Sequence, residues 1–298
     1  VPAQCRFLIA AVDVQGGRNR RFVVQIVGYG ENGERWLIDR YNISHTLPDE
    51  DGVVERIDPR IPENWDILLS DVLKKTYPLA QNEQHFMPIL AMAVDSGGEE
   101  GVTDNAYKFW RRCRRDGYAK RVYLVKGDST KRQKLITKTY PDNTARSDRH
   151  SSARGDVPIY LLQTDYLKDR INNALVRESS GANYIHFPDW LGEWFFNELT
   201  YEERGQDGKC NNEAFDLFCY AHAIAILRGY ERIRWGDENN VPLWAKLPEV
   251  NPDIIRIYST QAVENVEEMA KPSAKLTAST PAKNGWLNGG GRKKGGWL

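Results

Sequence analysis

Two apolar runs, each with an aspartate at or next to its end, constrain the fold of this chain more than any other feature. Residues 6–14 read RFLIAAVDV and residues 87–95 read MPILAMAVD, and Gly-Gly follows each within a few positions. Such runs are typical of strands that are buried on both faces of a sheet. A carboxylate at the end of a buried strand is costly unless a cation neutralises it. Asp13 and Asp95 are therefore the first candidates for a functional site.

The remaining apolar pattern predicts an α/β domain with a mixed sheet and helices on both faces. Residues 21–30 and 34–41 are rich in Val, Ile, Tyr and Trp, and Glu31-Asn32-Gly33 between them is a strong hairpin signal. With residues 6–14 they predict an antiparallel meander. Strands and helices then alternate, which indicates parallel neighbours. The further expected strands are 87–95, 121–125 and 159–162, and the expected helices are 62–77, 102–113, 165–176, 188–199 and 212–227.

The composition changes near residue 248, which predicts a domain over residues 1–247 and a flexible tail over residues 248–298. Pro, Ala, Ser, Thr, Gly and Lys dominate the tail, and residues 271–298 are basic without any acid. Trp286 and Trp297 lie there in two Gly-flanked GWL units. The formal net charge of the whole chain is zero, so any binding of nucleic acid must come from local basic patches.

Several classes of protein are disfavoured. The four cysteines form no CxxC pair, which argues against a thiolate metal site and favours reduced, packed thiols in a cytosolic protein. No apolar run approaches the roughly 18 residues that cross a bilayer, so we expect no membrane association. The sequence also lacks the G-x-x-x-x-G-K-[ST] phosphate loop of many ATPases.

A third acidic position lies in the helix expected at residues 212–227. Glu213 and Asp216 are three residues apart, so they share one helix face within an otherwise apolar segment. If Asp13 and Asp95 emerge side by side, one of these acids can join them. Oxygen ligands from three acids suit Mg²⁺ or Mn²⁺, and a pair of such ions promotes phosphodiester hydrolysis.

Four segments resemble a known family, the nuclease domain of lambda-type large terminase subunits of tailed phages. They are AVDVQ, GYGENGERWLID, AVDSGG and NEAFDLFCYAHAIAIL, and the resemblance runs from about residue 6 to residue 230. It implies an RNase H-like fold and an endonuclease that cuts concatemeric viral DNA during genome packaging in the host cytoplasm. It also implies that Asp13, Asp95 and Asp216 are the metal ligands, with Glu213 as an additional candidate. We expect two Mg²⁺ or Mn²⁺ ions there, with Asp13 bridging them.

The same resemblance implies a set of partners. These are double-stranded DNA, the small terminase subunit, an upstream ATPase motor domain and the portal of the procapsid, which the C-terminal tail would contact. Because the phosphate loop is missing here, the motor is not part of this chain. We therefore do not expect the chain alone to package DNA.

A polar stretch at residues 127–156 has little periodicity and more basic than acidic residues. A loop of this length in a compact domain is usually functional or disordered. Beside a nuclease centre it would hold the DNA backbone, whereas the alternative is a solvated segment without a role. The candidate DNA-binding residues of this stretch and its surroundings are Lys126, Lys131, Arg132, Lys134, Lys138 and, on the next helix, Lys168.

Other readings of these residues stay open. Asp13 and Asp95 could cap the turns that follow them, and Asp216 could pair with an arginine such as Arg204 or Arg228. AVDSGG also fits the second phosphate loop of an actin or sugar-kinase-type enzyme, although AVDVQGG lacks the Gly and Ser/Thr of the first loop. A third reading is a catalytically silent RNase H-like body whose basic tail docks on a portal.

Overall fold

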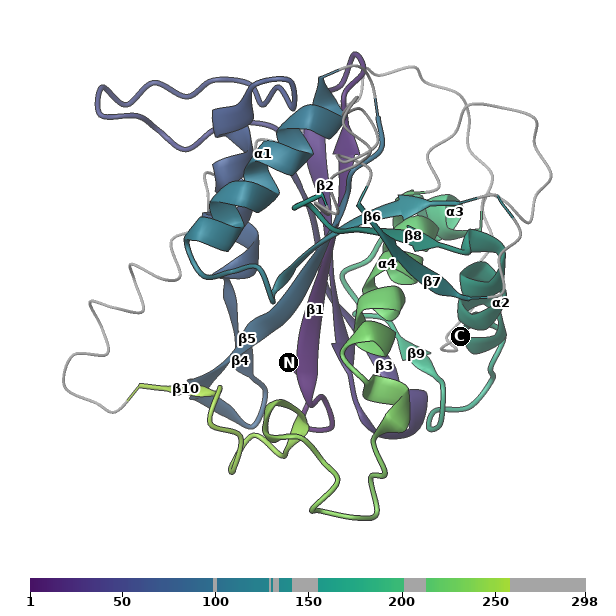
Figure 1. The fold of residues 1–298 in the computed structure, drawn as a ribbon. Coiled ribbons are helices and arrows are strands. Elements are labelled where there is room, and N and C mark those ends of the chain that lie inside the picture. The colour runs from purple at the N-terminus through teal and green to yellow at the C-terminus, as the bar shows by residue number, and fades with distance from the viewer. Residues whose placement is uncertain (99–100, 129, 131–133, 141–154, 201–212, 258–298) are drawn as a thin grey trace, which may run out of the picture. The chain divides into compact units, whose positions relative to one another are not determined.

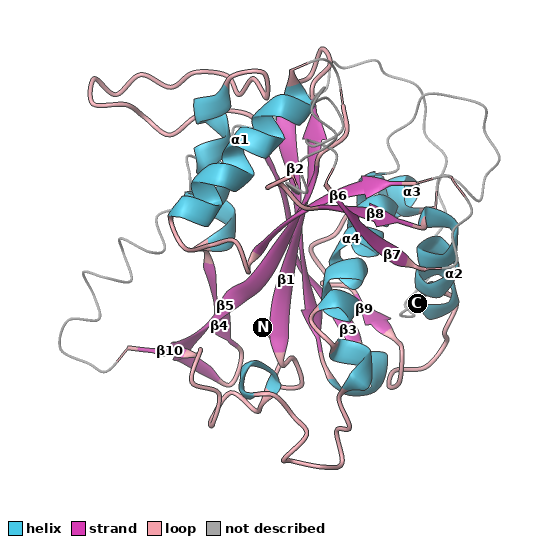
Figure 2. Ribbon diagram, viewed as in Figure 1, coloured by secondary structure: helices cyan, strands magenta, loops and turns pink. Residues whose placement is uncertain are grey.

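A ten-stranded mixed sheet organises the computed structural model of this protein (Figures 1 and 2). The structure describes residues 1–257 except 99–100, 129, 131–133, 141–154 and 201–212, and residues 258–298 lie outside the described part. The strands follow the order β7-β8-β6-β5-β1-β2-β3-β9, and β4 and β10 each pair with β5.

The first three strands form the predicted antiparallel meander. They are β1 (Phe7–Gln15), β2 (Arg21–Tyr29) and β3 (Arg35–Ile43). A short 3-10 turn at Glu31–Gly33 connects β2 to β3, and its residues Asn32 and Gly33 have φ angles of 54° and 87°. The Asn32-Gly33 pair therefore has the positive φ angles that make Asn-Gly a hairpin signal.

Parallel strands extend the sheet on the other side of β1. β5 (Asn82–Asp95) lies parallel to β1, and β6 (Val122–Gly127) and β8 (Ile159–Leu162) follow in parallel. The edge strands are β7 (Ile136–Thr139), antiparallel to β8, and β9 (Ile185–His186), parallel to β3. The predicted mixed sheet is thus confirmed, although β7 lies within the stretch expected to be a loop.

Helices cover both faces of the sheet (Figure 1). α1 (Val102–Arg115) packs over one face, whereas α2 (Thr164–Leu175), α3 (Glu193–Leu199) and α4 (Glu213–Leu227) lie on the other. β1 alternates between the two cores, since Leu8, Ala10 and Val12 pack on the α1 side and Phe7, Ile9 and Ala11 on the α4 side. This double burial is why its sequence is a continuous apolar run.

The helix predicted at residues 62–77 is confirmed only in part, because the segment is helical in 3-10 and π geometry and gives way to a strand before Tyr77. A 3-10 turn (Pro62–Asp66) and a π turn (Leu69–Leu73) are followed by a strand, β4 (Thr76–Leu79), which pairs with the first half of β5. β5 accordingly begins five residues earlier than expected. The first residues of β5, NEQHF, are exposed or half-buried, so no apolar run in the sequence indicates the antiparallel pair that β4 and β5 form. α3 is also shorter than the helix expected at residues 188–199.

The described structure continues past the expected domain boundary at residue 247. β10 (Ile255–Arg256) pairs antiparallel with β5, and the compact unit extends to Ile257. The rest of the expected tail, with Trp286 and Trp297, lies outside the described residues.

Two expectations from composition can be compared with the described residues. Cys5, Cys113 and Cys219 are free and buried, as expected for packed thiols, while Cys210 falls in an undescribed segment. Within the described part of the chain, every helix is too short or too polar to traverse a bilayer.

Glycine at the end of β2 permits a close approach, which gives a stability test. A Cβ atom on Gly30 would lie 2.7 Å from the Trp36 ring and 2.9 Å from the Gln4 carbonyl oxygen, while a Cβ on Gly17 would meet nothing within 4 Å. We expect Gly30→Ala to lower the free energy of unfolding by about 1–3 kcal/mol through overpacking, as measured by urea denaturation. Gly17→Ala is the control and should change it by less than about 0.5 kcal/mol. Equal effects of the two substitutions would contradict this account.

Candidate active site

Parallel pairing brings the ends of β1 and β5 to the same edge of the sheet. Val12 of β1 is in register with Val94 of β5, so Asp13 and Asp95 follow a directly paired position. Both aspartates continue the set of alternate residues that faces α4, which includes Ala11 on β1. The two carboxylates therefore emerge together beneath α4.

Helix α4 adds Asp216 to this edge. The helix packs against β1, β2 and β5, and twelve of its residues are buried. The pKa of Asp95 is raised to about 6, chiefly by burial and also by the charges of Asp13 and Asp216. The Gly97 N–H, which donates to Oδ1 of Asp95 at 2.8 Å, opposes this shift. The three carboxylates thus lie within electrostatic reach of one another.

Asp13 is held in a similar environment. Burial raises its pKa above the ordinary value, and the nearby charge of Glu213 acts in the same direction. The Gln15 side-chain amide donates a hydrogen bond to Asp13 and opposes this shift. No lysine or arginine in the described part of the chain is within ion-pair distance of either Asp13 or Asp95.

The donor chemistry of this edge fits a divalent cation. Buried carboxylates that repel one another favour a bound cation, and oxygen donors of this kind suit Mg²⁺ or Mn²⁺. Among the residues that the structure describes, however, no three Asp, Glu, His or Cys side chains converge closely enough to coordinate one ion.

Lys168 on α2 partly neutralises the acidic edge through its contact with Asp216. Its Nζ lies 3.4 Å from Oδ1 of Asp216 and 5.7 Å from the centre of the Phe215 ring. The sequence had offered an arginine as the partner of Asp216, whereas the structure supplies this lysine from the neighbouring helix. Lys168 was predicted to reach a phosphate, and its position beside Asp216 leaves that prediction in place.

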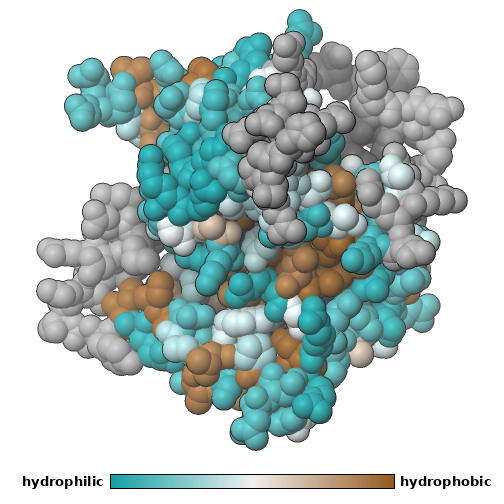
Figure 3. Space-filling model, in the orientation of Figure 1, coloured by the Kyte–Doolittle hydropathy of each residue, from teal (hydrophilic) through white to brown (hydrophobic). Residues whose placement is uncertain are grey.

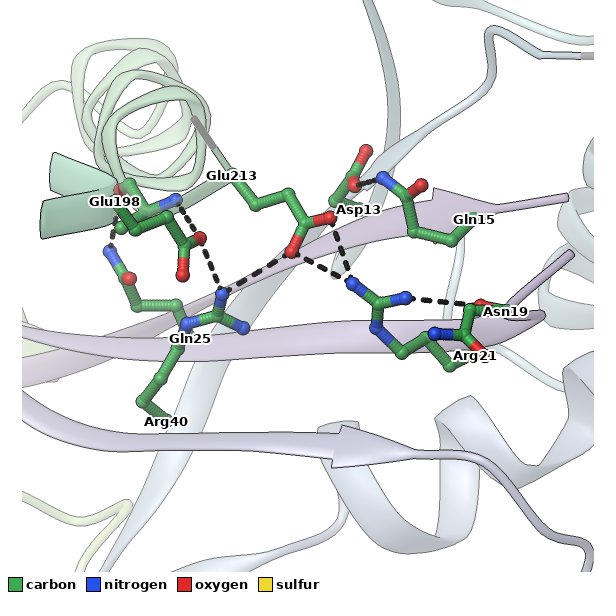
Figure 4. A network of polar contacts seen from close by, with 9 residues as sticks. Asp13, Gln15, Asn19, Arg21, Gln25, Arg40, Glu198 and Glu213 are labelled. Atoms are coloured by element: carbon green, nitrogen blue, oxygen red, sulfur yellow. Dashed lines mark hydrogen bonds and ion pairs between the residues drawn. The ribbon is translucent and has the colours of Figure 1, made fainter. Parts of the chain in front are cut away.

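Glu213 lies in an ion-pair network that the sequence did not predict (Figure 4). Arg21 of β2 donates to both carboxylate oxygens of Glu213, at 3.0 and 3.2 Å. Arg40 of β3 lies 3.6 Å from Glu213 and donates to Glu198 of α3 at 2.8 Å. These side chains are at most 17% exposed, so the network is largely shielded from water.

The same network fixes the first turn of α4. Glu198 accepts a hydrogen bond from the Ala214 N–H at 2.7 Å, and Gln25 of β2 donates to the Ala214 carbonyl oxygen at 3.4 Å. One signal for this was present in the sequence, because Gln25 interrupts an apolar strand and a buried amide needs a partner. Its partner could not be read from sequence, since it lies 189 positions away.

Some of the other predicted DNA-binding residues lie in the described part of the chain and some do not. Lys126 at the end of β6 is exposed, and its charge lowers the pKa of Asp95, so it lies near the carboxylates. Lys134 and Lys138 are exposed on or before β7. Lys131 and Arg132 fall outside the described residues.

The arginines of α1 form a separate surface that is largely neutralised. Figure 3 shows a hydrophilic surface over this helix. Each arginine nevertheless pairs with a carboxylate: Arg111 and Arg114 with Asp156, Arg112 with Asp66, and Arg115 with Asp116. This pairing favours a solvated surface without a DNA contact at these arginines.

Comparisons with known proteins agree with this arrangement. Residues 1–235 match the family described as "Terminase large subunit gpA, endonuclease domain". The chain belongs to this family of terminase endonuclease domains. The large terminase subunit of Escherichia phage lambda is 27% identical over 249 residues, covering 76% of this chain and 33% of that protein. The chain therefore spans about a third of the length of this relative. No solved structure matches it.

The terminase endonuclease-domain match includes all four acidic residues of the site. Asp13, Asp95, Glu213 and Asp216 lie between residues 1 and 235, as do Arg21 and Arg40. The match ends before β10 and before the basic tail.

The raised pKa of Asp95 predicts a pH dependence for the metal-free protein. Its folded-state value of about 6 exceeds the ordinary 3.8, so the protonated form favours folding and this contribution is lost as pH rises from about 4 to about 6. At pH 7.5 with a chelator, we expect Asp95→Asn to raise the free energy of unfolding by on the order of 1–3 kcal/mol in urea denaturation.

The exposed substitution Asp51→Asn serves as the control and should leave the pH profile unchanged. A loss of stability in Asp95→Asn at pH 7.5 would be incompatible with a repelled, desolvated carboxylate.

Proposed function

We propose that this chain is a metal-dependent DNA endonuclease that cuts concatemeric viral DNA during genome packaging. The observation that carries the proposal is that Asp13 and Asp95 follow paired residues at one edge of the sheet, with Asp216 within electrostatic reach, in a terminase endonuclease-domain chain. Phosphodiester hydrolysis needs concentrated negative charge that can hold divalent cations, and this edge supplies it.

The fold that we infer is RNase H-like. Three antiparallel strands followed by parallel ones, with helices on both faces, support this inference. The alternative actin or sugar-kinase-type enzyme requires two such sheets, and the described residues supply one ten-stranded sheet. The nuclease is therefore the better-supported function.

In the proposed site, Asp13, Asp95 and Asp216 hold two Mg²⁺ or Mn²⁺ ions. When bound, such ions activate water and stabilise the leaving 3′ oxygen. The chain's own residues orient the ligands: the Gln15 amide donates to Asp13, and the Gly97 N–H donates to Asp95. Because both hydrogen bonds favour the ionised carboxylates, they keep the acids in the form that binds cations.

Basic residues around this edge are proposed to hold the DNA backbone. Lys126 lies near Asp95 and Lys168 pairs with Asp216, so each can contact a phosphate beside the scissile bond. Lys134 and Lys138 extend the basic surface along β7, and Lys131 and Arg132 precede them in the sequence. Such contacts would depend strongly on salt and little on base sequence.

The partners follow from the family and are proposals as well. They are double-stranded DNA, the small terminase subunit, an ATPase motor domain upstream of this segment, and a procapsid portal contacted by the C-terminal tail, residues 248–298. The proposed location is the host cytoplasm. Docking of the tail can coexist with nuclease activity, because the site lies within residues 1–235.

Asp13→Asn tests the proposed reaction. We expect nicking of supercoiled plasmid in Mn²⁺ or Mg²⁺ to fall at least about 100-fold, because a neutral amide cannot replace a charged metal ligand. The measurement is an agarose-gel time course with and without a chelator. Asp51→Asn on an exposed loop is the matched control and should retain full activity. Cleavage that persists in Asp13→Asn, or that ignores the chelator, would refute the proposed mechanism.

Glu213→Gln separates two roles for that residue. If Glu213 chiefly neutralises Arg21 and Arg40, the metal-free variant should lose roughly 1–3 kcal/mol of unfolding free energy, because two shielded guanidinium groups lose their charge partner. Asp13→Asn is the comparison and should cause no such loss. If Glu213 is instead a metal ligand alone, metal-free stability will be unchanged and Mn²⁺ affinity measured by calorimetry will fall.

A further inference from the structure

A cavity of about 340 Å³ lies between α2, α4 and the start of β3. Its lining does not include Asp13, Asp95 or Asp216. His222 is six residues beyond Asp216 on α4, which corresponds to about 9 Å along the helix and a different face. The cavity is therefore separate from the proposed nuclease site. The lining residues used below are Arg35, Arg170, Asn173, Arg177, His222 and Glu231.

Polar atoms of two buried side chains at the cavity lack hydrogen-bond partners in the described protein. Arg35 is 3% exposed, and its Nε and Nη1 have no hydrogen-bond acceptor. His222 is 2% exposed, and its Nδ1 is also unpaired. A buried guanidinium without an acceptor is costly, and natural proteins rarely leave one so. Both residues line the cavity, so a ligand there can supply the missing acceptor.

The charge of the lining specifies the kind of ligand. Arg35, Arg170 and Arg177 contribute three guanidinium groups, against the single carboxylate of Glu231. Glu231 pairs with Arg170, so it does not neutralise Arg35. Burial, followed by the charges of Arg35 and Arg170, keeps the pKa of His222 well below its ordinary value, so its ring is neutral. The lining thus carries an excess of two positive charges.

Arginine forks of this kind match phosphate better than other anions. The planar guanidinium presents paired N–H donors at the spacing of two phosphate oxygens. A dianionic phosphate also balances the excess charge of the lining. The volume lies at the lower end of the range for small-molecule sites, which accommodates a phosphate group with a small organic substituent.

We propose that this cavity binds a small phosphate-bearing anion, either inorganic phosphate or a phosphate monoester such as a nucleoside monophosphate. Arg35 binds it from the buried floor, and Arg177 binds it at the exposed mouth. Because Arg35 belongs to β3, Arg177 follows α2 and His222 belongs to α4, the bound anion links three elements of the domain.

Calorimetric titration of the full chain tests this proposal. The protein is kept in a chelator so that phosphate cannot bind through a metal ion, and the ionic strength is matched with chloride. Separate arms use inorganic phosphate, a nucleoside 5′-monophosphate and a short DNA duplex. We expect saturable one-to-one binding of at least one of the first two, accompanied by a higher unfolding temperature.

Variants assign the binding to the cavity. We expect Arg177→Gln to weaken the binding about tenfold, through loss of one charge-assisted contact, and Arg35→Gln to weaken it further. Asp13→Asn and the exposed Arg115→Gln on α1 should bind like the original protein. Since Arg35 is buried and its replacement can impair folding, Arg177→Gln alone carries the test if Arg35→Gln is unfolded.

Three results would overturn the proposal. The first is the absence of saturable binding of both small phosphates. The second is binding that Arg177→Gln leaves unchanged. The third is binding of the duplex alone with sensitivity to Arg177→Gln, which would assign this surface to the DNA backbone. Loss of nuclease activity in Asp13→Asn has no bearing on any of them.

Discussion

The parallel pairing of β1 with β5 is the constraint on which the rest of the structure depends. β1 and the second half of β5 are buried on both faces, so their hydrogen bonds must be satisfied within the sheet and their side chains must fill two cores. The pairing also leaves both strands ending at one edge, where Asp13 and Asp95 follow neighbouring residues in register. The apolar interior thus positions the acidic site directly.

This placement concentrates like charge where water is scarce. Burial raises the pKa values of Asp13 and Asp95, and the charges of neighbouring carboxylates raise them further, so the metal-free site stores unfavourable electrostatic energy. Gln15 and the Gly97 N–H offset part of it through hydrogen bonds. Functional sites are commonly places where local stability is sacrificed, and this edge has that character.

The first turn of α4 carries acidic residues, and contacts from neighbouring elements hold it close to the acidic edge of the sheet. Arg21 and Arg40 place positive charge between the sheet and Glu213, and Glu198 accepts the hydrogen bond of the Ala214 N–H (Figure 4). Lys168 acts similarly at Asp216 from α2. The position of the third acid therefore depends on charges contributed by β2, β3, α2 and α3.

The sequence by itself determined much of the fold and the acidic residues at the edge of the sheet. Hydrophobic periodicity and composition predicted the meander, the parallel strands and the buried α4. The two apolar runs indicated Asp13 and Asp95. These patterns missed the pairing of β4 with β5, because the first residues of β5 are exposed or half-buried and follow no apolar pattern. Local pattern is informative where burial dictates residue type, and it is silent where polar chains pair in solvent.

Only the tertiary structure decided which polar groups meet. Arg21 and Glu213 are 192 positions apart, and Lys168 approaches Asp216 only because α2 packs on α4. The cavity floor at Arg35 and His222 likewise joins a strand and a helix far apart in the chain. An ion pair or an orphaned guanidinium has no periodic signature, since it depends on distances that arise only after the sheet and helices have packed.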